Sequence, residues 1–238
     1  MNRTDSWKKL DVLYEDNHLI VVNKRAGDIV QGDRTGDLSL LDLAKAYVKH
    51  KYNKPGDVFL GLVHRIDRPV SGVVVFARTS KALARMNELF KNYKVEKTYW
   101  AVVKNRPEME EAVLVNSLRK NEKQNKSYVC KEGASGSKSC ELFYRLCGVT
   151  DNYWMLEVKP KTGRHHQIRA QLSHIGSPIK GDLKYGASRS NRDGGIHLHA
   201  RSIKFVHPVK KIDLYIEAKV PKESLWSEFQ AQMVNAME

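Results

Sequence analysis

The most chemically suggestive segment of the chain places one carboxylate among several cations. Asp67 stands close in sequence to His64, Arg65 and Arg68, and an apolar run at 73–77 follows. Neighbouring cations keep a carboxylate ionised and oriented, as a carboxylate nucleophile requires. The alternative is a surface turn with a solvated ion pair, and this segment taken alone favours that alternative.

A later segment concentrates positive charge. Arg164 and Arg169 flank two histidines, and the pattern predicts a helix over 164–174 that Thr162 caps. Two guanidiniums near a helix N-terminus suit a phosphate or a carboxylate. If Asp67 lay beside them, a guanidinium could hold its carboxylate through two hydrogen bonds. A structural ion pair explains the same residues, so both interpretations stay open.

The histidines raise the question of a metal site. His197 and His199 lie on one face of an expected strand, as two ligands could, but the sequence nominates no third ligand. We therefore expect neither a metal nor a cofactor. The sequence also lacks the glycine-rich phosphate loops and the serine elbow of other enzyme classes, which argues against nucleotide hydrolysis, dinucleotide binding and serine hydrolase chemistry.

Composition points to a polyanionic partner. Lys and Arg number 41 against 27 Asp and Glu, giving a net charge of +14 over 238 residues, and nucleic acid is the commonest partner of such a chain. No apolar run is long enough to span a bilayer, and residues 1–9 lack the apolar core of a signal peptide. Three cysteines form no obvious pair. We expect a cytoplasmic protein with reduced thiols and no membrane partner.

Hydrophobic periodicity indicates an α+β fold built on a mixed, mainly antiparallel sheet with flanking helices. Ser39 and Thr79 are predicted N-caps of two amphipathic helices. The polar, basic stretch 118–138 is predicted to be a mobile loop that either contacts an RNA backbone or is a solvated connection. Strands are expected at 10–14, 18–24, 72–77, 96–103, 139–147, 153–159, 196–206 and 212–218, with a short helix near 222–230.

Several sequence elements occur in a recognisable order. They are the opening segment 12–27, His64-Arg65-Ile66-Asp67 with Ser71-Gly72, Lys97-Thr98-Tyr99-Trp100-Ala101, Gly163 to Arg169, Gly176 to Asp182, and Leu198-His199-Ala200. Together they resemble the RluA-type family of RNA pseudouridine synthases over about 11–220. Each motif alone is weak evidence, but their order along one chain is strong evidence.

The resemblance implies roles for particular residues. Asp67 would attack the target nucleotide, Tyr99 would lie against the flipped base, and Arg169 would pair with Asp67. A core tyrosine is the alternative for Tyr99, and support of the fold is the alternative to a phosphate contact for Arg164. Base extrusion is physically required, because stacking shields the glycosidic bond. The RNA-contacting residues implied are His64, Arg65, which would fill the space the base leaves, Arg68, Arg164, His166 and Gln167.

Pro69 and Val70 depart from the family pattern. Pro69 fixes the turn after Asp67, and Val70 lacks the hydroxyl that relatives often carry, so substrate fit is affected more than reaction type. Many relatives carry a small N-terminal RNA-binding domain. Here the pattern begins near residue 10, so we expect an N-terminal arm at 1–9 and one catalytic domain over 10–238.

The preferred prediction is a monomeric RNA pseudouridine synthase that acts on tRNA or rRNA without metal or cofactor. The main alternative is a non-catalytic RNA-binding protein of the same fold. The joint presence of Asp67, Tyr99 and Arg169 favours the enzyme, because phosphate binding has no need of a carboxylate. A metal-dependent nuclease would require clustered acids, which the sequence does not offer.

Overall fold

The computed structural model describes residues 7–32 and 36–235. The chain forms two compact units, the first comprising residues up to 95 with 200–219, and the second comprising 96–199 with 220 onward. Most of the predicted arm at 1–9 lies outside the described residues, and the single catalytic domain over 10–238 stays a prediction. Within the described ranges, no helix is both long enough and apolar enough for a transmembrane span.

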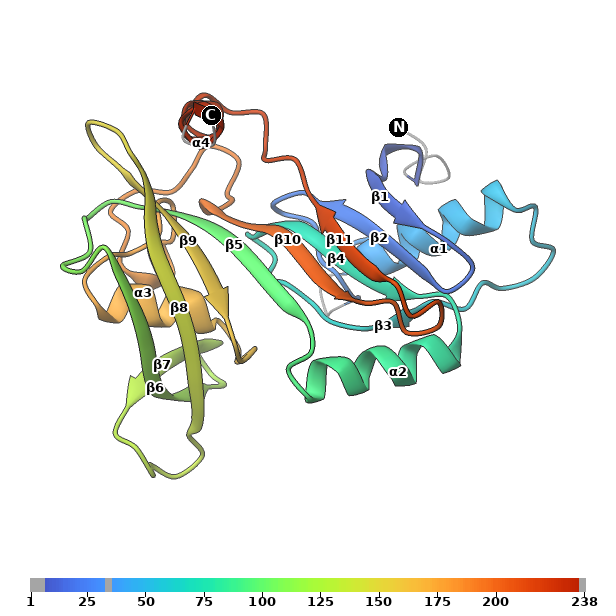
Figure 1. The fold of residues 1–238 in the computed structure, drawn as a ribbon, viewed down its shortest axis with the longest axis horizontal. Helices are drawn as coiled ribbons and strands as arrows, with labels where there is room; N and C mark the ends of the chain where they lie inside the picture. Colours follow the sequence, from blue (N-terminus) through green and yellow to red (C-terminus); the bar gives the residue numbers. More distant parts are fainter. Residues whose placement is uncertain (1–6, 33–35, 236–238) are drawn as a thin grey trace. The chain divides into compact units, whose positions relative to one another are not determined.

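The first unit is built on a sheet whose neighbouring strands Figure 1 shows side by side. The two strands expected at 10–14 and 18–24 are confirmed, and they pair antiparallel. In sheet order the strands are β1 (Val12–Glu15), β2 (Leu19–Lys24), β4 (Ser71–Ala77) and β10 (Leu198–Val206), with β3 (Gly61–Leu62) paired to β4 and β11 (Asp213–Glu217) paired to β10.

Two capped helices accompany this sheet. α1 (Leu40–Lys51) begins with Ser39, whose side chain accepts a hydrogen bond from the Asp42 backbone N–H while the Asp42 side chain accepts one in return. α2 (Ser80–Lys91) begins with Thr79, whose Oγ1 accepts a hydrogen bond from the Ala82 N–H at 3.1 Å. Both predicted N-caps are confirmed.

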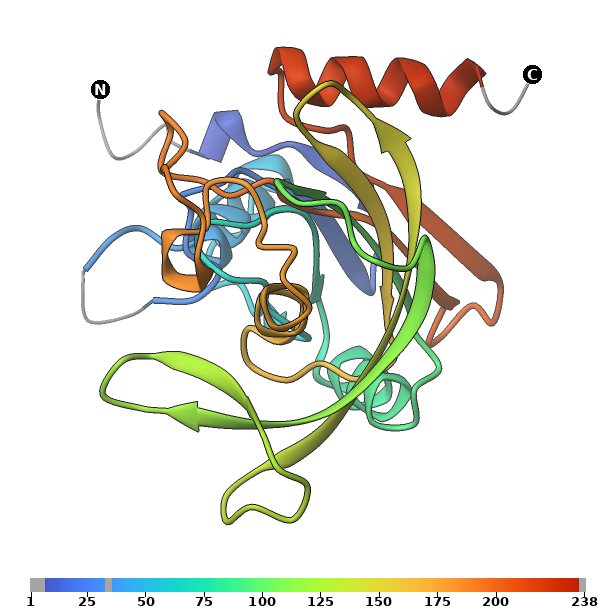
Figure 2. The ribbon, with the colours of Figure 1, turned by 90° about the vertical axis from the view of Figure 1, so that its left-hand side faces the viewer.

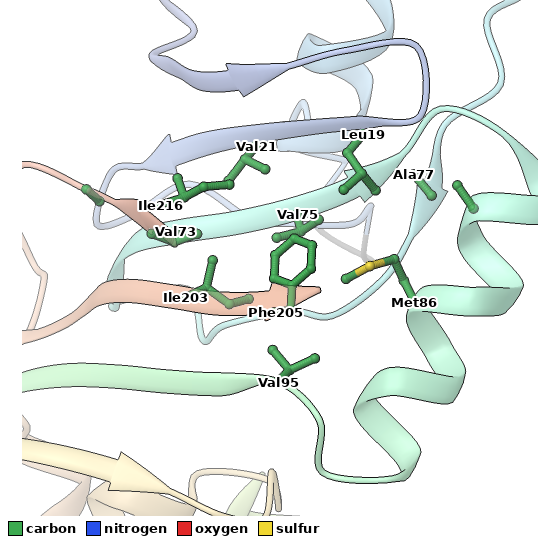
Figure 3. Close-up of a cluster of buried hydrophobic side chains, with 12 residues drawn as sticks. Leu19, Val21, Val73, Val75, Ala77, Met86, Val95, Ile203, Phe205 and Ile216 are labelled. Carbon is green, nitrogen blue, oxygen red and sulfur yellow. The ribbon is translucent and has the colours of Figure 1, made fainter. Parts of the chain in front are cut away.

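The core of the first unit lies between strands β2, β4 and β10 and helix α2 (Figure 3). Alternate residues of β2 and β4, such as Leu19 and Val75, point to the same face and meet Met86 of α2 and Phe205 of β10. Met86 is fully buried, and burial of such a side chain contributes about 1.5–3 kcal/mol. Burial of these apolar strands therefore fixes the ends of the loops that connect to them.

The second unit contains a sheet in which every neighbouring pair is antiparallel. Figure 2 shows helix α3 (Gln167–His174) end-on within the curve that β8 and β6 trace, and α3 contacts β6 and β7. In sheet order the strands are β5 (Glu96–Val103), β9 (Trp154–Pro160), β8 (Lys138–Val149), β6 (Glu111–Asn121) and β7 (Lys126–Cys130). The expected α+β class is confirmed.

The C-terminal helix α4 (Ser224–Asn235) runs further than the short helix predicted near 222–230. Its Trp226 and Phe229 are buried against Trp100, Val102 and Met155 of β5 and β9. This apolar cluster explains why the helix docks on the second unit.

The prediction of a mobile loop over 118–138 is wrong for most of its length. β6 continues to Asn121 and β7 starts at Lys126, so the two strands form a hairpin. Leu118 and Ser127 are buried while Arg119, Lys120 and Lys123 are exposed. A strand that is polar on one face has the composition of a loop, and only pairing with its neighbours identifies it as a strand.

Candidate active site

In the first unit, Asp67 lies on a tight turn between β3 and β4. The Val70 N–H donates to the Asp67 carbonyl at 3.0 Å, which closes the turn. Ile66 and Val70 are buried on either side, whereas Arg65 and Arg68 are exposed and Asp67 is half-buried. Because Ile66 and Val70 are buried, the turn is anchored, and the charged side chains of Arg65, Asp67 and Arg68 lie at or near the surface.

The buried side chain of Lys24, at the end of β2, fixes this turn through a hydrogen bond to the Arg68 carbonyl. Its side chain is 1% exposed, and Nζ donates to the carbonyl oxygens of Arg25, Asp28 and Arg68 at 2.9, 2.7 and 3.0 Å. Burial lowers the pKa of Lys24 to about 8, against the opposing influence of Asp28 and Asp67. The ammonium thus ties the residue after Asp67 to the loop that follows β2.

Gly72 is the second residue of β4, directly after the turn. Its φ is +113°, and a Cβ there would lie 2.2 Å from the carbonyl oxygen of Ala200. Only glycine combines that backbone conformation with so close an approach. The backbone conformation and the close approach of Ala200 therefore explain why glycine follows Ser71 in this motif.

Two predicted RNA-contacting residues of this unit already have intramolecular partners. His64 Nε2 accepts a hydrogen bond from the Val75 N–H at 3.1 Å, and its ring stacks on Phe90 at 5.1 Å. Arg68 pairs with Asp37 at 2.8 Å, with both side chains about half exposed. The RNA contacts of His64, Arg65 and Arg68 stay predictions, and the exposed arginines are better placed for them than the histidine.

In the second unit, Arg169 forms a two-bonded ion pair with Asp182. Arg169 Nε donates to Oδ2 at 2.7 Å and Nη2 donates to Oδ1 at 2.9 Å. The Arg169 Cζ lies over the Tyr185 ring, 5.0 Å from its centroid. Asp182 takes one edge of the guanidinium, and the Nη1 edge is not part of this pair.

The segment before α3 differs from its predicted form. The helix begins at Gln167 rather than Arg164, because His166 adopts a left-handed conformation with φ +53°. Thr162 does not cap the helix, since its hydroxyl donates to the Gln167 side chain at 2.7 Å. Arg164 consequently precedes the helix, where it is exposed and donates to the Ser139 carbonyl at 2.9 Å.

His166 and Gln167, both predicted to contact RNA, are buried within the second unit. The Gln167 amide donates to the Glu141 carbonyl at 3.0 Å and its oxygen accepts from the Arg164 N–H at 3.0 Å. His166 Nδ1 lies 3.0 Å from the Tyr185 hydroxyl. Their RNA contacts stay predictions, but these bonds give both residues a structural role.

Tyr99 lies on β5, opposite Val158 of β9, and is half-buried rather than part of the apolar core. Lys97 precedes it by two residues and so shares its face of the strand. Burial lowers the pKa of Lys97 to about 8, and its Nζ donates to the Thr162 carbonyl at 3.4 Å. This face of β5 therefore combines an aromatic ring with a desolvated ammonium.

The roles of Lys24, Asp182 and Tyr185 were not apparent from the sequence. Asp182 was part of a recognised motif and Lys24 ended a predicted strand, but the sequence did not indicate which groups their side chains would bond. A lysine that ends an otherwise apolar strand, and an acid that follows a glycine turn, are the available signals. Among the described residues, no three His, Cys, Asp or Glu side chains gather as a metal site would require.

Comparison with known proteins identifies the class of enzyme. The RNA pseudouridylate synthase family model matches residues 18–174. The tRNA pseudouridine synthase C of Vibrio cholerae is 32% identical over 251 residues, covering 95% of this chain and 100% of that protein. The ribosomal large subunit pseudouridine synthase C of Buchnera aphidicola is 32% identical over 220 residues, covering 87% of this chain and 66% of that protein.

These matches define an isomerase that modifies RNA. The chain belongs to the RNA pseudouridylate synthase family, and the resemblance to its RluA-type branch is confirmed. The fold agrees, since human RNA Pseudouridylate Synthase Domain Containing 4 superposes with a TM-score of 0.78 at 23% identity, covering 97% of this chain and 95% of that one.

Proposed function

We propose that this enzyme converts a specific uridine of tRNA or rRNA to pseudouridine, with Asp67 as the nucleophile. The observation that carries the proposal is the fixed turn that presents Asp67 in a chain of this family. Three backbone carbonyls around the Lys24 ammonium hold that turn. A preorganised carboxylate needs no rearrangement when the nucleotide arrives.

The proposed reaction is an isomerisation. The target base is flipped from its stack, the Asp67 carboxylate attacks the nucleotide, and the bond between N1 of uracil and C1′ of the ribose breaks. The uracil rotates, and C5 bonds to C1′ as the bond between the Asp67 carboxylate and the nucleotide breaks. The hydrogen on C5 then leaves as a proton while N1 gains one. No oxidant, reductant, metal or cofactor enters this balance.

The other site residues then have defined tasks. Tyr99 would contact the flipped base and assist the proton movement, and Arg65 would fill the space that the base leaves. Arg169 would hold the Asp67 carboxylate. The pairing with Asp182 supports this task, because it orients the guanidinium through one edge and does not involve the Nη1 edge.

RNA as substrate is supported by two observations. The chain carries a net charge of +14, and its relatives are named for tRNA and for ribosomal RNA. We propose a monomer that meets its substrate in the cytoplasm. Which of the two RNA classes is modified would be decided by mapping pseudouridine in total RNA with and without the protein.

Tritium release from RNA that carries 5-labelled uridine tests the proposal directly. Asp67→Asn should abolish release while folding and most of the RNA affinity are retained, because an amide of the same shape is a poor nucleophile. Asp213→Asn, which removes an exposed carboxylate of the same unit, is the matched control and should release tritium normally.

Two outcomes would contradict the proposal. Robust release by Asp67→Asn would exclude Asp67 as the nucleophile. Binding without release by the wild-type protein, tested on total cellular RNA lacking the modification, would favour the non-catalytic RNA-binding alternative.

A further inference from the structure

Tyr185, the last residue of the 3-10 turn η2 (Leu183–Tyr185), joins three parts of the second unit. Its side chain is 4% exposed. The ring packs on the Arg169 guanidinium, with 5.0 Å between Cζ and the ring centroid. The hydroxyl contacts Ser127 of β7 and His166, which precedes α3.

The hydroxyl fixes the ring in place. It accepts the Ser127 N–H at 2.9 Å and donates to the Ser127 carbonyl at 3.1 Å. Because its single proton is used for that carbonyl, His166 Nδ1, at 3.0 Å, must act as a donor to the same oxygen. The ring is therefore tied to a strand and to the start of a helix at once.

The ring and Asp182 restrain Arg169 in complementary ways. The two hydrogen bonds to Asp182 fix the guanidinium within its own plane. They leave tilting of that plane weakly restrained, and the face of an aromatic ring resists such tilting through packing and cation–π attraction. An arginine that is bonded along one edge to Asp182 and packed over the Tyr185 ring is restrained in its orientation.

We infer that Tyr185 is a positioning residue for catalysis, acting through Arg169. The inference rests on the proposed function, in which Arg169 holds the Asp67 carboxylate. The aromatic face orients the guanidinium, and the hydroxyl keeps the ring where that face is useful. Tyr185 has no chemical role of its own in this scheme.

Two substitutions separate the ring from the hydroxyl. Tyr185→Leu removes both, whereas Tyr185→Phe keeps the face that packs on Arg169. Tyr144→Leu is the control for general destabilisation, because Tyr144 is 2% exposed, lies on β8, and donates its hydroxyl to the Met109 carbonyl. Each variant is measured for single-turnover tritium release at saturating RNA and for RNA affinity.

Tyr185→Leu should slow release about ten- to a hundredfold, since small misplacements of a catalytic contact have effects of that size. RNA affinity should change less than about threefold, well below the loss in rate. Tyr185→Phe keeps the ring but loses the hydroxyl that anchors it, so it should recover most but not all of the rate. Tyr144→Leu should leave the rate unchanged.

A graded test applies even where Tyr185→Leu does not fold. Phenylalanines with increasing fluorination, incorporated at 185, retain the ring shape while weakening its attraction for a cation. The rate should fall as fluorination increases. A flat series, or an unchanged rate in folded Tyr185→Leu, would overturn the inference. Inactive wild-type protein would instead defeat the proposed function, so the two failures are distinguishable.

Discussion

Arg169 and Asp182 form an ion pair that is almost completely removed from solvent. Their side chains are 5% and 1% exposed, and two hydrogen bonds of 2.7 and 2.9 Å join them. In contrast, Arg68 and Asp37 form a pair in which both side chains are about half exposed. The same chemical partners therefore contribute very differently, because solvent screens only the second pair.

Asp182→Asn should destabilise the protein strongly. Removing one charge from a buried pair leaves the guanidinium uncompensated, and the free energy of unfolding should fall by about 3–5 kcal/mol. Asp37→Asn should cost less than about 1 kcal/mol. Urea denaturation of both variants measures the difference, and equal losses would refute the distinction between the two pairs.

The β6–β7 hairpin should contribute to RNA binding through charge. Replacing Lys120, Lys123 and Lys126 together with alanine should weaken affinity and reduce the slope of log affinity against log salt by up to about 2, or about 0.7 for each phosphate that these lysines neutralise. The matched control replaces Lys81, Lys91 and Lys94, three exposed lysines of α2 and the turn after it. If the slope falls equally in both triple variants, the hairpin has no special role.

Acid should destabilise the protein through buried histidines. Burial, followed by the nearby Lys180, lowers the pKa of His197 to about 3, and burial also lowers the pKa of His207. Between about pH 6.5 and 3 the unfolded chain takes up a proton at His197 that the folded chain does not. Stability is therefore complete above pH 6.5 and is lost as the pH falls.

His197→Gln should consequently flatten the pH dependence of stability. Between pH 7.5 and 5.5, the wild-type protein should lose about 1.4 kcal/mol more than this variant does. His174→Gln, at the exposed end of α3, is the control and should behave like the wild type. Urea midpoints at the two pH values give the comparison, and parallel curves for all three proteins would contradict the assignment to His197.

Tritium release should persist in excess chelator, because a carboxylate nucleophile requires no metal. The RNA must be folded identically in both arms, so the assay uses a short unstructured or prefolded substrate whose conformation is checked without magnesium. Loss of release with EDTA and recovery with zinc or manganese would overturn the metal-free mechanism.

Sequence alone determined the features that depend on neighbours along the chain. Ser39 and Thr79 were identified as N-caps because a cap bonds a backbone N–H only a few residues away. Apolar runs likewise predicted β2 and β4, since a strand buried on both faces needs no polar alternation. The order of motifs indicated the family, and membership of that family implies the enzyme class.

The tertiary structure decided what depends on pairing between distant segments. Lys24 bonds a carbonyl 44 positions away, and Arg169 finds Asp182 only because the chain turns back between them. Segment 118–138 has the composition of a loop, yet much of its backbone pairs as a hairpin in which few side chains are buried. Composition and spacing describe each side chain separately, whereas these contacts depend on where the backbone brings two of them together.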